Sequence, residues 1–160
     1  MISKLKATML AVAIAATSAG AAAQNGVLAP NAPKDAPVHS DSAMQLHTQI
    51  APYVAQARAS YPPAKARYLA GLPKDQNFFV TVALTDNFGH EEMVFIFVRR
   101  IAGSDVSGVL ASDILSVKGY AKGQAITVPE TRILDWLISK PDGSEEGNVV
   151  GRYLDTHGQH

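Results

Sequence analysis

Apolar positions recur at helical spacing after Ser40, a residue type that is favoured at the N-cap of a helix. Together they form one stripe along a predicted helix: Ala43, Leu46, Ile50, Val54 and Ala57. Pro52 falls inside this stripe, so we expect a kink or a break there. Tyr61-Pro62-Pro63 is expected to end the helix, and Pro63 to open a second short helix that stops at Gly71-Leu72-Pro73.

The pattern then changes to β-branched and aromatic residues. The segments 77–85 and 92–101 have this composition, and Asp86-Asn-Phe-Gly-His90 between them has turn chemistry, so we predict a β-hairpin. In the second of these strands both faces are apolar, as in a central strand covered on both sides. One face carries Met93, Phe95 and Phe97, and the other carries Val94, Ile96 and Val98.

Three further strands are predicted at 108–111, 125–128 and 133–139, and a short C-terminal helix at 148–154. Helices that come first and strands that follow favour an α+β fold. We therefore expect a single domain over residues 39–156, in which N-terminal helices pack on a mainly antiparallel sheet of about five strands.

The N-terminus has the three parts of a secretory signal peptide. A basic start, Met1-Ile-Ser-Lys-Leu-Lys6, precedes the apolar run 7–16, and Ala21-Ala22-Ala23 provides an Ala-x-Ala cleavage site. We predict cleavage after Ala23 and a periplasmic protein. The proline-containing segment 24–38 is predicted to be a flexible linker, and residues 157–160 a disordered tail.

The composition of the chain limits the kinds of partner and active site that it can have. Removal of 23 residues from 160 leaves 137, enough for one domain with a real core. Loss of Lys4 and Lys6 leaves 12 basic against 14 acidic residues, a formal charge of −2. This near-neutral charge predicts no nucleic-acid partner, and nothing after residue 24 is apolar enough to span a membrane. The absence of cysteine excludes disulfides, thiol nucleophiles and cysteine zinc sites.

Asp135 is the most conspicuous candidate for chemistry, because it lies in the apolar segment Ile133-Leu-Asp-Trp-Leu-Ile138. In a regular strand it shares a face with Ile133 and Leu137, where an unpaired carboxylate is costly. Three interpretations of Asp135 are open. It is a structural group bonded to backbone amides of a neighbouring loop, or a ligand contact at a pocket rim, or a general acid or base. Trp136 points the opposite way, either into the core or as a binding platform.

The predicted hairpin turn supplies the other candidate binding residues. Phe88 at its tip either contacts a partner or folds back over the sheet edge. His90 and Glu92 are expected to share a face at the mouth of the hairpin, as a surface pair or as ligands.

Several well-known catalytic and metal-binding patterns fail. His90-Glu91-Glu92-Met93-Val94 ends in Val where a His-Glu-x-x-His zinc motif needs His, and it lies in a predicted strand. The acidic turn Asp142-Gly-Ser-Glu-Glu-Gly-Asn148 lacks the alternating ligands of a calcium loop. Neither a serine-nucleophile elbow nor a phosphate-binding loop is present. The sequence thus predicts no catalytic residue, no metal site and no cofactor.

Residues from about Tyr61 to Asp155 resemble the YegJ-like family, the bacterial domain of unknown function 2314. The residues that carry the likeness include His90-Glu-Glu-Met93, Gly108-Val-Leu110, Lys122-Gly-Gln-Ala-Ile126, Ile133-Leu-Asp-Trp136 and Asp142-Gly-Ser-Glu-Glu-Gly-Asn148. The resemblance implies a compact α+β fold, frequent occurrence in small exported proteins and no established activity.

Two hypotheses from different classes follow. The first is a non-catalytic periplasmic module that binds a protein or an envelope component through residues among Phe88, His90, Glu92, Asp135 and Trp136. The second is a periplasmic hydrolase that uses Asp135 with His90 or Glu92, which requires these groups within hydrogen-bond reach of one another across adjacent strands.

Overall fold

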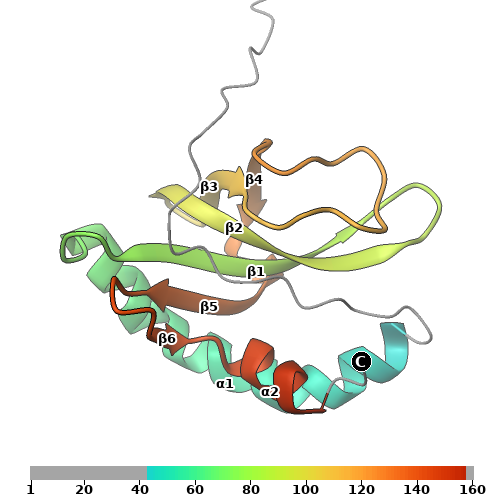
Figure 1. Cartoon of the computed structure of the whole chain (residues 1–160), viewed down its shortest axis with the longest axis horizontal. Helices are drawn as coiled ribbons and strands as arrows, with labels where there is room; N and C mark the ends of the chain where they lie inside the picture. Colours follow the sequence, from blue (N-terminus) through green and yellow to red (C-terminus); the bar gives the residue numbers. More distant parts are fainter. Residues whose placement is uncertain (1–42, 158–160) are drawn as a thin grey trace, which may run out of the picture.

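One antiparallel sheet and two helices make up the computed structural model, which describes residues 43–157. The strand order is β4-β3-β2-β1-β5-β6; helix α1 runs along one face of the sheet and α2 lies beside α1 (Figure 1). The predicted α+β fold is therefore confirmed, with six strands where about five were expected. The elements are α1 (Ala43–Ala70), β1 (Asn77–Thr85), β2 (Glu91–Ala102), β3 (Asp105–Leu110), β4 (Ala125–Pro129), the 3₁₀ turn η1 (Glu130–Arg132), β5 (Ile133–Ser139), β6 (Glu145–Gly147) and α2 (Val149–His157).

Helix α1 is continuous over 28 residues and passes through Pro52, Pro62 and Pro63, so the predicted helix end at Tyr61-Pro62-Pro63 was wrong. All three prolines lie on the exposed side of the helix. A proline removes one backbone hydrogen bond, and on this side water can replace it. The buried stripe therefore continues past the prolines to its last members: Ile50, Ala57, Tyr61 and Ala64.

Trp136 ties the sheet to the middle of α1. Its indole Nε1–H lies 3.1 Å from the Ala57 carbonyl oxygen and 3.0 Å from Ser60 Oγ, so both can accept from it. The ring is 6% exposed and belongs to the main core, which fills the space between α1 and the sheet. Core residues from β1 and β2 on this face include Phe78, Val80, Val94 and Ile96.

The predicted hairpin is present, with β1 and β2 paired from Phe79 opposite Phe97 to Thr85 opposite Glu91. The two faces of β2 differ in burial. Val94, Ile96 and Val98 are at most 3% exposed in the main core, whereas Met93 and Phe95 on the other face are half-buried. A smaller cluster occupies that other face: Phe79, Phe97, Ala111 and Leu137.

A bulge in β5 changes the predicted environment of Asp135. Thr81 pairs with Asp135 but the next residue, Val82, pairs with Ile133, so Leu134 is left over. Ile133 consequently joins Trp136 in the main core, while Asp135 stays on the face of Leu137. The prediction that Asp135 shares a face with Ile133 was wrong, because a regular alternation does not allow for the extra residue.

The acidic turn after β5 folds back as β6, which sequence reasoning read only as a turn. Gly147 has φ +82°, and a Cβ there would lie 2.3 Å from the Trp136 carbonyl oxygen. Only glycine permits this close approach of β6 to β5. Asn148, with φ 53°, then leads into α2, which is packed on α1 by a stack of Tyr153 on Tyr53 with ring centroids 4.2 Å apart.

Several predictions fall on residues outside the described part of the chain. They concern the signal peptide (1–23), the linker (24–38) and all but His157 of the tail (157–160). His157 is the last residue of α2. Within residues 43–157, no helix combines the length and apolar character needed to cross a membrane.

Candidate functional site

Asp135 lies at the corner between β5 and the first turn of α2. Its Oδ2 accepts a hydrogen bond of 2.6 Å from the Val150 amide, and its Oδ1 accepts one of 2.8 Å from the Trp136 amide. Further backbone amides at the start of α2, those of Val149 and Gly151, also favour the ionised carboxylate. The side chain therefore serves as an N-terminal cap for α2 that comes from another element, since the first amides of a helix have no partners within it.

Burial dominates the electrostatics of this carboxyl group. The pKa of Asp135 is raised above its ordinary value, because desolvation disfavours the charge more than the amides of Trp136, Val150 and the α2 start favour it. The residue is 1% exposed. Of the three interpretations of Asp135, this geometry matches the structural one, in which the carboxylate accepts backbone amides. Trp136, 6% exposed, lies in the core beside it.

Glu92 performs a similar task at the start of β2, on the opposite face of the sheet. Its Oε2 accepts hydrogen bonds from the Ser116 amide (2.7 Å) and the Val117 amide (3.2 Å), and its Oε1 accepts one from the Leu115 amide (2.9 Å). Burial acts to raise the pKa of Glu92, but these bonds together outweigh it and lower the pKa. Glu92 is 8% exposed and holds the β3–β4 loop against the start of β2.

Asp86 closes the hairpin turn in the same manner. Its Oδ1 accepts from the amides of Phe88 and His90 (2.8 and 3.0 Å), and its Oδ2 accepts from the Lys118 amide (3.0 Å) and contacts His90 Nδ1 (2.9 Å). The pKa of Asp86 is held well below its usual range, because these hydrogen bonds together outweigh an opposing desolvation. The expected partnership of His90 with Glu92 was therefore wrong: the carboxylate beside His90 is Asp86.

The hydrolase hypothesis requires Asp135 close to Glu92 or His90, and the strand register separates them. Asp135 pairs with Thr81 on one side of β1, and Glu92 pairs with Leu84 on the other side. Two strand spacings of about 4.8 Å and three residues of about 3.3 Å place their Cα atoms roughly 14 Å apart. They also lie on opposite faces of the sheet, and His90 lies farther from Asp135, in the hairpin turn just before the start of β2. The predicted catalytic combination is not assembled.

Three exposed apolar side chains lie on the elements that surround the hairpin turn. Phe88 is 77% exposed, Leu115 65% and Met44 81%. They come from the hairpin turn, from the β3–β4 loop that Glu92 holds, and from the first turn of α1, which His47 joins to Glu91 through a contact of 2.6 Å. We call Met44, His47, Phe88, His90 and Leu115 the hairpin end.

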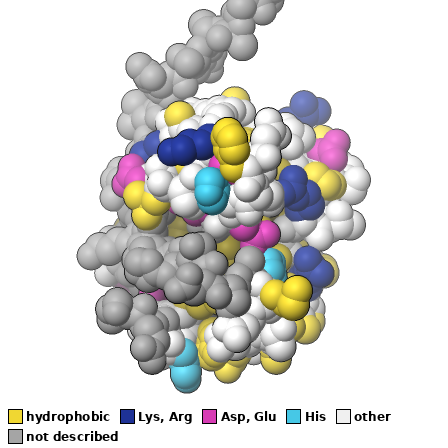
Figure 2. All heavy atoms as spheres, turned by 90° about the vertical axis from the view of Figure 1, so that its right-hand side faces the viewer, with side chains coloured by type: hydrophobic (Ala, Val, Ile, Leu, Met, Phe, Trp, Pro, Cys, Tyr) yellow, Lys and Arg dark blue, Asp and Glu magenta, His cyan; other side chains and the backbone are white. Residues whose placement is uncertain are grey.

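Figure 2 faces the hairpin end and shows hydrophobic, histidine, acidic and basic side chains close together on it. Two histidine–carboxylate pairs, His90 with Asp86 and His47 with Glu91, lie beside the apolar groups. Within residues 43–157, no group of three or more His, Asp or Glu side chains is placed to hold a metal ion.

Sequence reasoning found Phe88 and His90 but missed Asp86, Leu115, Met44 and His47. The signal for Asp86 was present, because an Asp at the start of a turn commonly bonds to the amide two residues later. Leu115 and Met44 carried no signal, since single apolar residues in a loop or helix are ordinary on protein surfaces.

Comparison with known families gives one match. The profile of a family described as an uncharacterized protein conserved in bacteria, DUF2314, matches residues 64–154, which is more than half of the chain. The matched region runs from the second half of α1 into α2 and includes Asp86, Glu92 and Asp135. No curated protein and no solved structure matches the chain significantly.

Proposed function

Given that the chain belongs to the DUF2314 family of uncharacterized bacterial proteins, we propose that it is an exported, non-catalytic module that binds a protein of the cell envelope through its hairpin end. The observation that carries the proposal is the way in which Phe88 and Leu115 are presented. Both are exposed, yet the backbone amide of each is fixed by a carboxylate of the same hairpin, Asp86 for Phe88 and Glu92 for Leu115.

This arrangement suits binding because the contact residues are ordered before a partner arrives. An exposed apolar side chain on a flexible loop loses backbone and rotamer entropy when it binds a partner. Here the loops around Phe88 and Leu115 are held by charge-assisted hydrogen bonds, so less entropy remains to be lost. Exposed apolar side chains gathered at one end are also typical of interaction sites, whereas those scattered singly are not.

The same carboxylates argue against catalysis at the hairpin end. Asp86 accepts three backbone amides and contacts His90, and Glu92 accepts three backbone amides and the Ser116 hydroxyl. Both have pKa values below their ordinary values, which makes them weak bases near neutral pH. Their geometry supports a role in holding loops for contact with a partner.

A direct test is photo-crosslinking in living cells with a benzophenone amino acid placed at position 88. We expect a discrete crosslinked band from Phe88, because its side chain projects outward from an ordered turn. Position 69 is the matched control, since Leu69 is also an exposed apolar residue, at 57%, but lies in the last turns of α1. Crosslinking at position 69 and at position 88 to the same extent and to the same proteins would contradict the proposal.

A second test replaces the exposed apolar side chains of the hairpin end and measures how much they contribute to binding. Phe88→Ser with Leu115→Ser is expected to reduce the crosslink from a neighbouring benzophenone at position 87 by about tenfold or more, since two apolar anchors of about 1–2 kcal/mol each are lost. The melting temperature should stay within about 2 °C of the parent, because neither side chain contributes to the core. An unchanged crosslink in this variant would count against the hairpin end.

Export is tested separately by mass spectrometry of the protein from a periplasmic fraction. We expect a mature N-terminus at Gln24, as predicted from the Ala-x-Ala site. A full-length protein that stays with the cytoplasmic fraction would refute export without bearing on the hairpin end.

A further inference from the structure

The two edges of the sheet differ in how they are protected. The outer edge of a sheet is a row of backbone N–H and C=O groups with which another strand can pair, and charges, prolines or a short strand normally guard it. Strand β6, at one edge, is three residues long and contains Glu145 and Glu146. Strand β4, at the other edge, is five residues long, contains no charged side chain and has its single proline, Pro129, at its end. The edge at β4 is therefore the less guarded of the two.

The register of β4 shows which of its backbone groups face outward. Within the described part of the chain, β4 pairs with β3 only. The Leu110 amide donates to the Gln124 carbonyl oxygen at 2.9 Å, and antiparallel bonds use every second residue, so the bonds to β3 continue at Ile126 and Val128. The residues that direct their backbone groups away from β3 are Ala125, Thr127 and Pro129, and all three are exposed. We call these outward groups the β4 edge.

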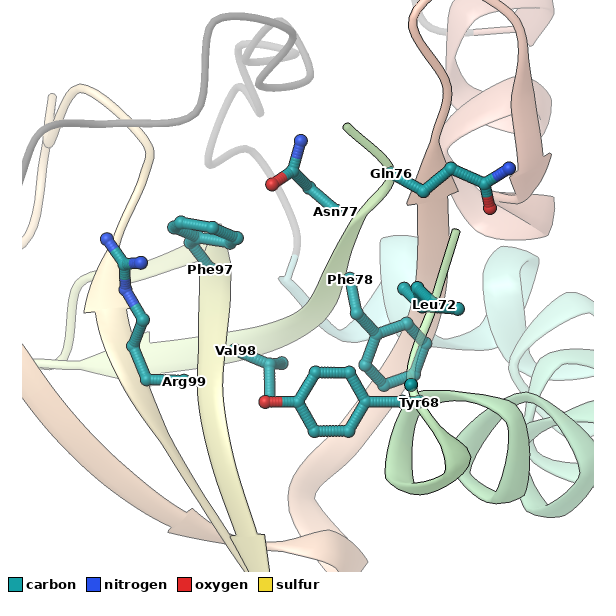
Figure 3. Close-up of a pocket in the computed structure, with 9 residues that line it drawn as sticks. Tyr68, Leu72, Gln76, Asn77, Phe78, Phe97, Val98 and Arg99 are labelled. Carbon is teal, nitrogen blue, oxygen red and sulfur yellow. The ribbon is translucent and has the colours of Figure 1, made fainter. Parts of the chain in front are cut away.

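The β4 edge is distinct from the groove of the molecule. That groove, roughly 400 Å³ in volume, lies where α1 ends, β1 begins and β2 passes, and its walls include Tyr68, Phe78 and Val98 (Figure 3). A groove of this kind takes a small ligand, whereas a row of backbone donors and acceptors is matched by the backbone of another extended strand. The occupant that fits the β4 edge is therefore a strand.

We propose that the protein forms a symmetric dimer, in which the β4 edges of two copies pair antiparallel and join two six-stranded sheets. A two-fold axis beside Ile126 places Ala125 of each copy opposite Thr127 of the other. Each copy then donates two hydrogen bonds, from Ala125 and Thr127, and accepts two at the carbonyl oxygens of the same residues. Pro129, which has no N–H, stays outside the paired stretch. A register one residue longer puts Pro129 opposite Ala125 and leaves the Ala125 carbonyl oxygen without a donor.

Strand β4 is complementary to itself, which favours a second copy as the occupant. Ile126 is half-buried against the main core, and at the axis it meets Ile126 of the second copy in a pair without hydrogen bonds, where side chains come closest. Lys122 precedes β4 and Glu130 follows it, so antiparallel pairing brings opposite charges together at both ends. Both side chains also have ion-pair partners within their own chain, so this attraction sets the direction of pairing and adds little to its strength.

The register is tested by disulfide crosslinking, because the chain has no cysteine of its own. Ile126→Cys places two thiols in a pair without hydrogen bonds, whose Cα atoms lie about 4.5 Å apart, within the range of a disulfide. Thr127→Cys is the matched control, since the axis puts its two Cα atoms roughly 8 Å apart, beyond that range. In the purified protein treated with diamide, we expect Ile126→Cys to form a covalent dimer about tenfold faster than the more exposed Thr127→Cys.

The hydrogen bonds are tested by sedimentation equilibrium of Thr127→Pro. The N–H of Thr127 faces away from β3, so proline removes a donor of the β4 edge and leaves the bonds to β3 in place. Thr127→Val is the matched control, because both variants lose the contact of 2.8 Å between the Thr127 and Ser107 hydroxyls but only proline loses the N–H. We expect the dimer dissociation constant to rise about tenfold for Thr127→Pro and less than about threefold for Thr127→Val.

Three results would overturn the proposal: a parent protein that stays monomeric up to about millimolar concentration, a dimer that Thr127→Pro leaves as strong as Thr127→Val does, or crosslinking at position 127 as fast as at position 126. If Thr127→Pro does not fold, the two cysteine variants decide the matter. Neither Ile126 nor Thr127 belongs to the hairpin end, so the dimer and the binding of an envelope protein through Phe88 can each fail alone.

Discussion

Two regions of the molecule, the corner between β5 and α2 and the hairpin end, are each held by buried or half-buried carboxylates. The pKa values of these carboxylates shift in opposite directions in the two regions. In both, a carboxylate from one element accepts backbone amides of another: Asp135 for α2, Glu92 and Asp86 for loops at the hairpin. Burial raises the pKa of Asp135, whereas hydrogen bonds lower the pKa of Glu92 and Asp86. The number of amides alone does not set the ionisation; the depth of burial decides it.

The two regions also differ in what their carboxylates support: one supports the fold and the other supports an exposed surface. Asp135 is 1% exposed and faces the inside of the molecule, so its bonds fix the position of α2. Glu92 and Asp86 lie under a surface from which Phe88 and Leu115 project. Loss of the Asp135 carboxylate should therefore destabilise the whole fold. Loss of the Glu92 or Asp86 carboxylate should loosen only the loops at the hairpin.

The largest expected effect is that of Asp135→Ala. It leaves the Val150 amide and its neighbours at the start of α2 buried without acceptors, and each buried unpaired donor costs about 1–3 kcal/mol. We predict a loss of about 3–5 kcal/mol in the free energy of unfolding, measured by urea denaturation. Asp142→Ala is the control, because Asp142 bonds only within an exposed turn and should cost less than about 1 kcal/mol. Equal losses for the two variants would show that α2 does not depend on Asp135.

A smaller and more local effect is expected from Glu92→Gln. The substitution keeps the shape but places an NH₂ group against backbone donors, and it removes the charge that strengthens the bonds to Ser116 and Val117. We predict a loss of about 1–2 kcal/mol and a faster hydrogen exchange of the 115–117 amides, with the amides of β5 unchanged.

Glu91→Gln is the matched control for this experiment. It lies next to Glu92 in β2 but contacts His47 and no amide of the β3–β4 loop. Its exchange rates at 115–117 should match the parent protein. Uniform acceleration of exchange throughout the sheet in Glu92→Gln would instead mean that Glu92 supports the global fold, as Asp135 does.

Those parts of the fold could be predicted from the sequence in which residue type and the spacing of apolar positions alone determine the secondary structure. The hairpin followed from β-branched residues around Asp86-Asn-Phe-Gly-His90, and β5 from its apolar run. The continuous α1 could not be predicted, because the cost of Pro62 and Pro63 depends on whether their side of the helix faces water. That is a property of the packing against the sheet, which no local pattern contains.

The site was predicted only in part for a similar reason. Phe88 and His90 were found because they lie in one short turn. The partners of Glu92 were missed, and the amides that bond to Asp135 could be expected but not named, because these partners are backbone amides 15 to 25 residues away in the chain, which no residue type marks. The bulge at Leu134, which turns Asp135 away from Ile133, is likewise set by pairing with β1.

The smallest effect, and the one that compares the two regions directly, is the pH dependence of these stabilities. The folded-state pKa of Glu92 lies below its ordinary value of 4.5, so its contribution is fully present above about pH 4.5 and is lost as the pH falls through the folded-state pKa. The folded-state pKa of Asp135 lies above its ordinary value of 3.8, so ionisation of Asp135 reduces stability as the pH rises from 3.8 through the folded-state pKa.

The two variants should consequently diverge in urea unfolding between pH 3 and pH 7. The destabilisation caused by Glu92→Gln should shrink as the pH falls below 4.5, and that caused by Asp135→Asn should shrink as the pH rises above 3.8, each with a slope of at most about 1.4 kcal/mol per pH unit. Slopes of the same sign for both variants would mean that the amides around Asp135 outweigh its burial. The corner of α2 would then be held by the same electrostatic balance as the hairpin end, and the contrast between the two regions would reduce to their position in the fold.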